Sequence, residues 1–198
     1  MNIFLQGMGV GAGLIIAIGA QNTFVLTQGI RRQHHWLIAA ICSCSDMLLI
    51  FIGAAGLGSI IAGNPTFRTG AAWAGAVFLF WLGVKAFKGA WAGKQLCERK
   101  EVAVGLRTAV LTTLALTFLN PHVYIDTILL IGSIGGQYQS IERLAFALGA
   151  SVSSVLWFFT LSLGGSLLAP LFQKSIAWRI LDLVVCMTMW TIAWQLVP

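Results

Sequence analysis

The sequence consists largely of long apolar runs that follow one another with short polar breaks. Six such runs cover residues 3–27, 36–62, 69–91, 108–134, 143–171 and 178–197. A helix that crosses the hydrocarbon core of a bilayer needs roughly 20 apolar residues, whereas a barrel strand needs about 9–11. In lipid every backbone polar group must be paired internally, so a span is either a helix or a barrel strand. Runs of this length predict an all-α integral membrane protein of about six transmembrane helices.

The composition agrees with a chain surrounded by lipid. Of the 198 residues, 58% are hydrophobic and 9% are charged, against roughly 25% charged in a soluble domain. Six spans with short connections use up this length, so we interpret residues 1–198 as a single transmembrane transporter domain. An excess of twelve Lys and Arg over six Asp and Glu would suggest nucleic acid in a soluble protein. Here it is expected to mark cytoplasmic loops, with no nucleic-acid partner.

The basic residues are concentrated on alternate connections. The odd-numbered connections hold ten of them and the even-numbered connections hold two, Arg68 and Arg143. Basic loops stay in the cytoplasm, so both termini are predicted on the extracytoplasmic side. Three helices in each half would invert the second half relative to the first, which is compatible with a 3+3 inverted repeat. Transporters of that kind bind substrate where two interrupted helices meet.

Polar residues interrupt the first and fourth runs at corresponding positions. In the first run, Gly19 permits an unwound segment, and the amides of Gln21 and Asn22 follow it. These amides would hold the amino or carboxylate group of a substrate, or would hydrogen-bond between helices.

In the fourth run, Asn120, Pro121 and His122 form the interruption. Pro121 has no N–H, so the carbonyl of Thr117 loses its helical partner. A bound cation would satisfy this carbonyl, and so would a threonine side chain or a water molecule. The Asn120 amide both donates and accepts hydrogen bonds.

Two carboxylates lie inside apolar runs, Asp46 in the second and Asp126 in the fourth. Placing a carboxylate at the centre of a bilayer costs at least roughly 2.5–3.5 kcal/mol on insertion scales, so each needs a partner or a wet cavity. Each would neutralise a cationic substrate or carry a coupling proton. The structural alternative pairs Asp126 with His122, one helical turn earlier, and Asp46 with Lys85. We favour the functional interpretation for both.

Other chemistries find little support. The chain has no Walker-type phosphate loop and no dinucleotide fingerprint. It also has no Ser/His/Asp set with a plausible base, so neither an enzyme nor a cofactor is expected. The four cysteines, Cys42, Cys44, Cys97 and Cys186, lack paired zinc-type spacing, so no metal site is expected. Cys42, Cys44 and Cys186 lie in apolar runs and are interpreted as small packing residues.

With these residues identified, the chain resembles the LysE/ArgO-type family of basic amino-acid exporters. The resemblance runs in order along nearly the whole chain and is carried by Gly19-Ala20-Gln21-Asn22-Thr23-Phe24-Val25, Gln28-Gly29-Ile30-Arg31-Arg32-Gln33, Ser45-Asp46, Leu119-Asn120-Pro121-His122-Val123-Tyr124-Ile125-Asp126-Thr127, Gly132-Ser133-Ile134-Gly135-Gly136-Gln137 and Trp157-Phe158-Phe159. Two positions depart from relatives. His122 stands where other branches often carry lysine, and Ala20 stands where proline is frequent, which leaves the strength of the first break open.

The resemblance implies a bacterial inner-membrane exporter of L-lysine, L-arginine or both, driven by the proton-motive force. The residues on the family's motif positions are Asn22, Asp46, Asn120, Pro121 and Asp126.

The expected site lies between the first, second and fourth helices. Asp46 and Asp126 would meet the cationic group or the proton, while Gln21, Asn22 and Asn120 would hold the backbone end of the substrate. Tyr124, four residues after Asn120, would line the same cavity. A homodimer is plausible for so small a bundle. The alternatives from other classes are a membrane thiol–disulfide relay and a structural subunit of a larger membrane complex.

Overall fold

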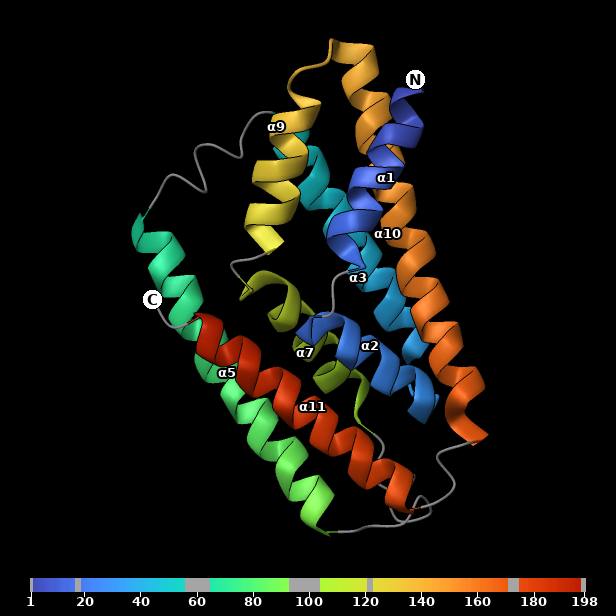
Figure 1. Cartoon of the computed structure of the whole chain (residues 1–198), viewed down its shortest axis with the longest axis vertical. Coiled ribbons are helices and arrows are strands. Elements are labelled where there is room, and N and C mark those ends of the chain that lie inside the picture. Colours follow the sequence, from blue (N-terminus) through green and yellow to red (C-terminus); the bar gives the residue numbers. More distant parts are fainter. Residues whose placement is uncertain are drawn as a thin grey trace.

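The computed structural model describes residues 2–16, 19–55, 65–92, 104–120, 123–170 and 175–196, and within these ranges it contains helices and no strand (Figure 1). The helices are α1 (Ile3–Ile15), α2 (Ala20–Arg31), α3 (His35–Ala54), α5 (Pro65–Ala92), α7 (Leu106–Phe118), the π-helix η1 (Tyr124–Leu130), α9 (Ile131–Gly135), α10 (Ser140–Leu168) and α11 (Ser175–Leu196). The prediction of an all-α membrane protein is confirmed.

The apolar runs become helices with two interruptions. The first run divides into α1 and α2, which meet at 84°, and the fourth divides into α7 and the η1–α9 segment. The sequence predicts that the first run ends at residue 27, with a polar loop from Gln28 to His35, and this end is wrong because α2 continues to Arg31. The helix ends there because Arg32 adopts the left-handed conformation (φ 54°), and its N–H bonds back to the carbonyls of Gln28 and Gly29. Such a left-handed residue is a common helix terminator.

Membrane-spanning capacity is clearest in α3 and α10. Within the described ranges, these two helices are long and apolar enough to cross a bilayer, and α1 with α2 would add a third span as one bent unit. The count of six spans and the inverted repeat therefore stay predictions.

Each interrupted span packs on an unbroken helix of the other half. Helices α1 and α2 lie along α10, while α7, η1 and α9 lie against α3 (Figure 1). A Cβ atom added at Gly29 of α2 would lie 2.6 Å from the Ser162 carbonyl oxygen, and one at Gly53 of α3 would lie 2.9 Å from the Thr127 carbonyl oxygen. This reciprocal exchange is the arrangement that an inverted repeat would produce.

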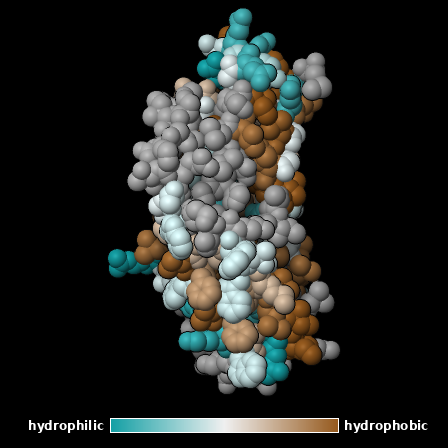
Figure 2. All heavy atoms as spheres, turned by 60° about the vertical axis from the view of Figure 1, so that its left-hand side comes forward, coloured by the Kyte–Doolittle hydropathy of each residue, from teal (hydrophilic) through white to brown (hydrophobic). Residues whose placement is uncertain are grey.

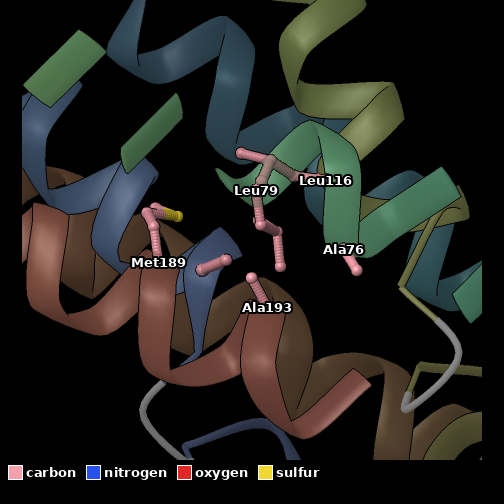
Figure 3. Close-up of a cluster of buried hydrophobic side chains, with 6 residues drawn as sticks. Ala76, Leu79, Leu116, Met189 and Ala193 are labelled. Carbon is pink, nitrogen blue, oxygen red and sulfur yellow. The ribbon is translucent and has the colours of Figure 1, made fainter. Parts of the chain in front are cut away.

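Helices α5 and α11 form an antiparallel pair beside the others (Figure 1). A cluster of small and medium apolar side chains joins this pair to α2 and α7, and Figure 3 shows these side chains pointing toward one another. The members are Ala20, Ala76, Leu79, Leu116, Met189 and Ala193.

The outside of the bundle is apolar, as lipid contact requires. Large exposed side chains include Trp91 and Trp194, at 83% and 82% exposure. In Figure 2, hydrophobic residues line an edge of the molecule, and hydrophilic residues gather at the top, where α9 connects to α10. In water such a surface would mark an aggregating protein, so it is a surface for hydrocarbon chains.

The close approach of α2 to α10 predicts a sharp contrast between neighbouring glycines. In Gly165→Ala the new methyl would lie 2.7 Å from the Leu26 carbonyl oxygen and 3.0 Å from the Gly29 Cα atom. Overpacking of this kind costs about 1–3 kcal/mol, so we expect the melting temperature of the detergent-purified protein to fall by several degrees. The matched control is Gly164→Ala, whose Cβ meets nothing within 4 Å. Equal melting temperatures for the two variants would contradict the observed packing.

Candidate functional site

The first helix break is closed by a side chain from beyond it. Helix α1 ends at Ile15, and the Asn22 Nδ2 atom of α2 donates to the Ile15 carbonyl oxygen at 2.9 Å. The Thr23 hydroxyl donates to the Gly19 carbonyl oxygen, also at 2.9 Å. The predicted interruption around Gly19 is therefore present, and Asn22 is part of what holds it.

The second break uses the same device. Helix α7 ends at Phe118, and the Tyr124 hydroxyl of η1 donates to the Phe118 carbonyl oxygen at 2.8 Å. Tyr124 thus reaches back across the interruption, which is a holding role beyond the cavity-lining role expected of it. Pro121 and His122 lie outside the described residues.

The segment after the second break is a π-helix, η1, from Tyr124 to Leu130. Such segments are rare and frequently occur at functional sites. Asp126 belongs to η1, and its side chain lies outside the described part of the structure. The expected alignment of Asp126 with His122 on one helix face therefore stays a prediction.

The two breaks come together in space. One small cavity touches both Ala20, the first residue of α2, and Asn120, which follows α7. The other lining residues are Phe78, Leu79, Ala115, Leu116 and Leu119. Asn120 is half-buried here, beside the start of the helix that carries Gln21 and Asn22.

Asp46 lies inside the bundle on α3 and is 4% exposed. Its Oδ2 atom accepts a hydrogen bond of 2.9 Å from the Ser154 hydroxyl of α10. In the part of the chain that the structure describes, no basic side chain forms an ion pair with it. Lys85, the partner offered by the structural alternative, lies with its Nζ atom 5.2 Å from the centre of the Trp81 ring. The carboxylate therefore remains available to a cation or a proton from elsewhere.

Gln21 faces the same region from α2. Its side chain lies against the Cys42 thiol, one helical turn before Asp46 on α3. Gln21 is 9% exposed, and its Nε2 atom is buried with no hydrogen-bond acceptor in the structure. A thiol is a weak acceptor, so the surroundings of Asp46 contain a buried amide donor that meets only the Cys42 thiol, and an acid without a cationic partner among the described residues.

Sequence reasoning missed the contribution of the fifth apolar run. It placed the site between the first, second and fourth helices, whereas the hydroxyl that contacts Asp46 comes from α10. The signal available was the group of serines at 151, 153 and 154 inside an apolar helix. Ser151 and Ser153 bond to carbonyls within α10, and Ser154 reaches across to α3.

The described cysteines form no disulfide with one another. Cys42 and Cys186 are buried free thiols, and Cys44 is an exposed free thiol. Cys97 lies outside the described residues.

Comparison with known proteins now decides the family. The model of the LysE type translocator family matches residues 12–198, a range that contains both breaks, Asp46 and Ser154. The chain belongs to the LysE type translocator family. It is therefore grouped with proteins that move a solute across a membrane.

Individual members of the family are similar over nearly their whole length. The arginine exporter protein ArgO of Serratia proteamaculans is 43% identical over 195 residues, which is 98% of this chain and 95% of that protein. ArgO of Escherichia coli K12 is 42% identical over 194 residues, covering 98% and 92% of the two chains. No solved structure matches the chain.

The hydroxyl that closes the second break offers a single-atom test. In Tyr124→Phe the Phe118 carbonyl loses its donor, and an unpaired carbonyl in this setting costs about 1–3 kcal/mol. We expect a melting temperature several degrees below that of the native protein in detergent. The control is Tyr138→Phe, the other tyrosine of the chain, whose ring packs against Phe146 at a tilted angle. Equal melting temperatures for the two variants would show that the Tyr124 hydroxyl does not stabilise the break.

Proposed function

We propose that the chain exports a basic L-amino acid, arginine and/or lysine, across the bacterial inner membrane. The observation that carries the proposal is the buried Asp46 carboxylate, which has a neutral hydroxyl beside it and no cationic partner among the described residues. Relatives at 42–43% identity are named as arginine exporters. An uncompensated carboxylate inside a membrane bundle is costly, and a positively charged passenger would offset that cost.

The proposed cation site is built around two carboxylates. Asp46 on α3 would pair with the guanidinium or ammonium group of the substrate. Asp126 in η1 would be the second carboxylate, since η1 packs along α3 and its Thr127 carbonyl lies beside Gly53. A guanidinium offers a planar fork of N–H donors that fits a carboxylate in a bidentate manner, whereas an ammonium acts as a point charge. Arginine would therefore gain more from this pair than lysine.

The backbone end of the substrate would be held at the breaks. Gln21 has a buried amide donor in this region that meets only the Cys42 thiol, and Asn120 lines the cavity where the breaks meet. Asn22 would act by fixing the start of α2 through its bond to the Ile15 carbonyl. Tyr124 would fix the start of η1 in the same way. Three of these side chains would frame the substrate from two helices, α2 and η1, and Asn120 would contribute from the break after α7.

The interruption at Pro121 and His122 would complete this frame. Proline removes a backbone donor at the break, so the carbonyl it frees is available to a substrate ammonium group. The imidazole of His122 can both donate and accept a hydrogen bond, so it would relay the proton proposed below.

Proton influx would supply the energy. Moving one positive charge outward against a 100 mV inside-negative potential costs about 2.3 kcal/mol. One proton entering for each monocation leaving makes the cycle electroneutral, so this cost vanishes and the pH gradient provides the drive. Lipid covers the apolar outside in this scheme. The proposal also places both termini on the extracytoplasmic side, as the basic-residue asymmetry indicates, and admits a homodimer.

The proposed export function predicts that removing the charge of Asp46 lowers the rate of arginine export. Cells carrying the native chain should release radiolabelled arginine faster than cells without it, and should resist the toxic analogue canavanine. Asp46→Asn keeps the shape of the side chain and removes its charge, so we expect export to fall at least ten-fold. Glu142→Gln is the control, because Glu142 is an exposed acid in the first turn of α10.

Equal efflux from cells with and without the native chain would reject export of basic amino acids. Export by Asp46→Asn at the native rate would instead reject only the role given to that carboxylate. Repeating the assay with purified protein in liposomes tests the structural-subunit alternative, because such a subunit would not transport alone. A variant lacking all four cysteines should keep full export, and its failure to do so would favour the thiol–disulfide relay.

Coupling is tested by imposing gradients on proteoliposomes. If protons are exchanged, an inwardly directed proton gradient (acidic outside) at zero membrane potential should accelerate arginine efflux several-fold. A membrane potential imposed without a pH gradient should have little effect on the efflux. Flux that ignores the pH gradient and follows the potential would rule out one-for-one exchange in favour of uniport.

A further inference from the structure

A second glutamine on α2 is buried without a partner. Gln28 is 3% exposed, and its Oε1 atom is enclosed yet accepts no hydrogen bond in the structure. The main-chain carbonyl of this residue is satisfied, because it accepts from the N–H groups of Arg32 and Gln33. Buried side-chain acceptors nearly always have a donor, so the side chain of Gln28 calls for an explanation that the fold alone does not supply.

Gln28 lies on the same face of α2 as Gln21. The two are seven residues apart, which is close to two turns and about 10 Å along the helix. Gln21 faces Cys42 of α3, so the face they share is turned toward α3. The remaining buried polar side chains of α2 are satisfied within the chain: Asn22 bonds to the Ile15 carbonyl and Thr27 to the Thr23 carbonyl.

An apolar layer separates the two glutamines. Val25 lies between them on α2 and is fully buried against Ile38, Cys42 and Phe158. Beyond Gln28, the start of α3 is tied to α10, because His35 Nδ1 lies 2.8 Å from the Ser162 hydroxyl. Gln28 therefore sits in a closed position on one side of an apolar seal, with Gln21 and Asp46 on the other.

We propose that the Gln28 carboxamide oxygen accepts a hydrogen bond from an N–H group of the substrate's cation during passage along α2. This rests on the proposed function, since it supplies a further contact for the same basic amino acid. The acceptor is neutral, so Gln28 offers directional hydrogen bonding without strong charge attraction. Such a contact is weak enough to release the cation toward Asp46, which a transport path requires. Its oxygen has no partner in the closed structure because its donor is the passenger.

The test compares Gln28→Met with the native chain in proteoliposomes. Methionine keeps the length of the side chain and removes the acceptor. We expect the KM for arginine to rise on the order of ten-fold, the effect of losing a hydrogen bond to a charged group, with a smaller change in kcat. The melting temperature should stay equal or rise, because an unpaired buried amide is replaced by an apolar group. The thermal shift caused by added arginine should shrink in parallel, since that shift follows affinity.

Thr27→Val is the matched control, because Thr27 is a buried neighbour whose hydroxyl is already bonded within α2; its KM should stay native. A KM within two-fold of native for Gln28→Met would overturn the inference, and would indicate that an ordered water pairs with the oxygen. A melting temperature that falls together with transport would also overturn it, in favour of a structural role. Native protein that moves no basic amino acid would reject the proposed function itself, a result distinct from either.

Discussion

Backbone groups that water cannot reach must be paired by the protein, and this constraint shapes the whole bundle. Where α1 and α7 stop inside the chain's apolar runs, their last carbonyls would be left without partners. Asn22 and Tyr124 reach back over the breaks to the carbonyls of Ile15 and Phe118. The same solution appears in both halves of the chain, and it lets two helices stop in the interior without the full cost of an unpaired group. The cavity between the breaks exists because these ends are held open and satisfied.

The buried carboxylate of Asp46 differs from the carbonyls at the breaks in how it is paired. The breaks are completed by the chain itself, whereas Asp46 has one neutral hydroxyl from Ser154 and no cation in the described part of the structure. A group selected only for stability would be neutralised by a fixed partner, because an unpaired buried charge costs more than a buried ion pair. Incomplete compensation is what a site for a moving cation needs, since a permanent partner would compete with the passenger.

The helices can be predicted from the sequence because each membrane span requires a long continuous run of apolar residues. The sequence also locates both breaks, since Gly19 and Pro121 are local signals that act through their own backbone. It cannot find Ser154, because the pairing of that hydroxyl with Asp46 depends on how α3 and α10 pack across more than a hundred residues. It places Gln28 in a loop, because the left-handed turn that ends α2 at Arg32 has no distinctive residue type. The residues of η1 likewise carry no local signal that predicts its π-helical form.

The positions of three buried polar side chains indicate where a substrate would pass through the bundle. The α5–α11 pair joins the bundle through an apolar cluster of small side chains (Figure 3), and such a surface gives a cation nothing to bind. Gln21, Gln28 and Asp46, by contrast, all lie where α2, α3 and α10 meet. Glycines let α2 approach α10 closely along this seam, and close-packed interfaces switch between discrete arrangements rather than deforming smoothly. A path along the seam would therefore open by shifting α2 against α3 and α10, which breaks the apolar layer at Val25 and exposes both glutamines in turn.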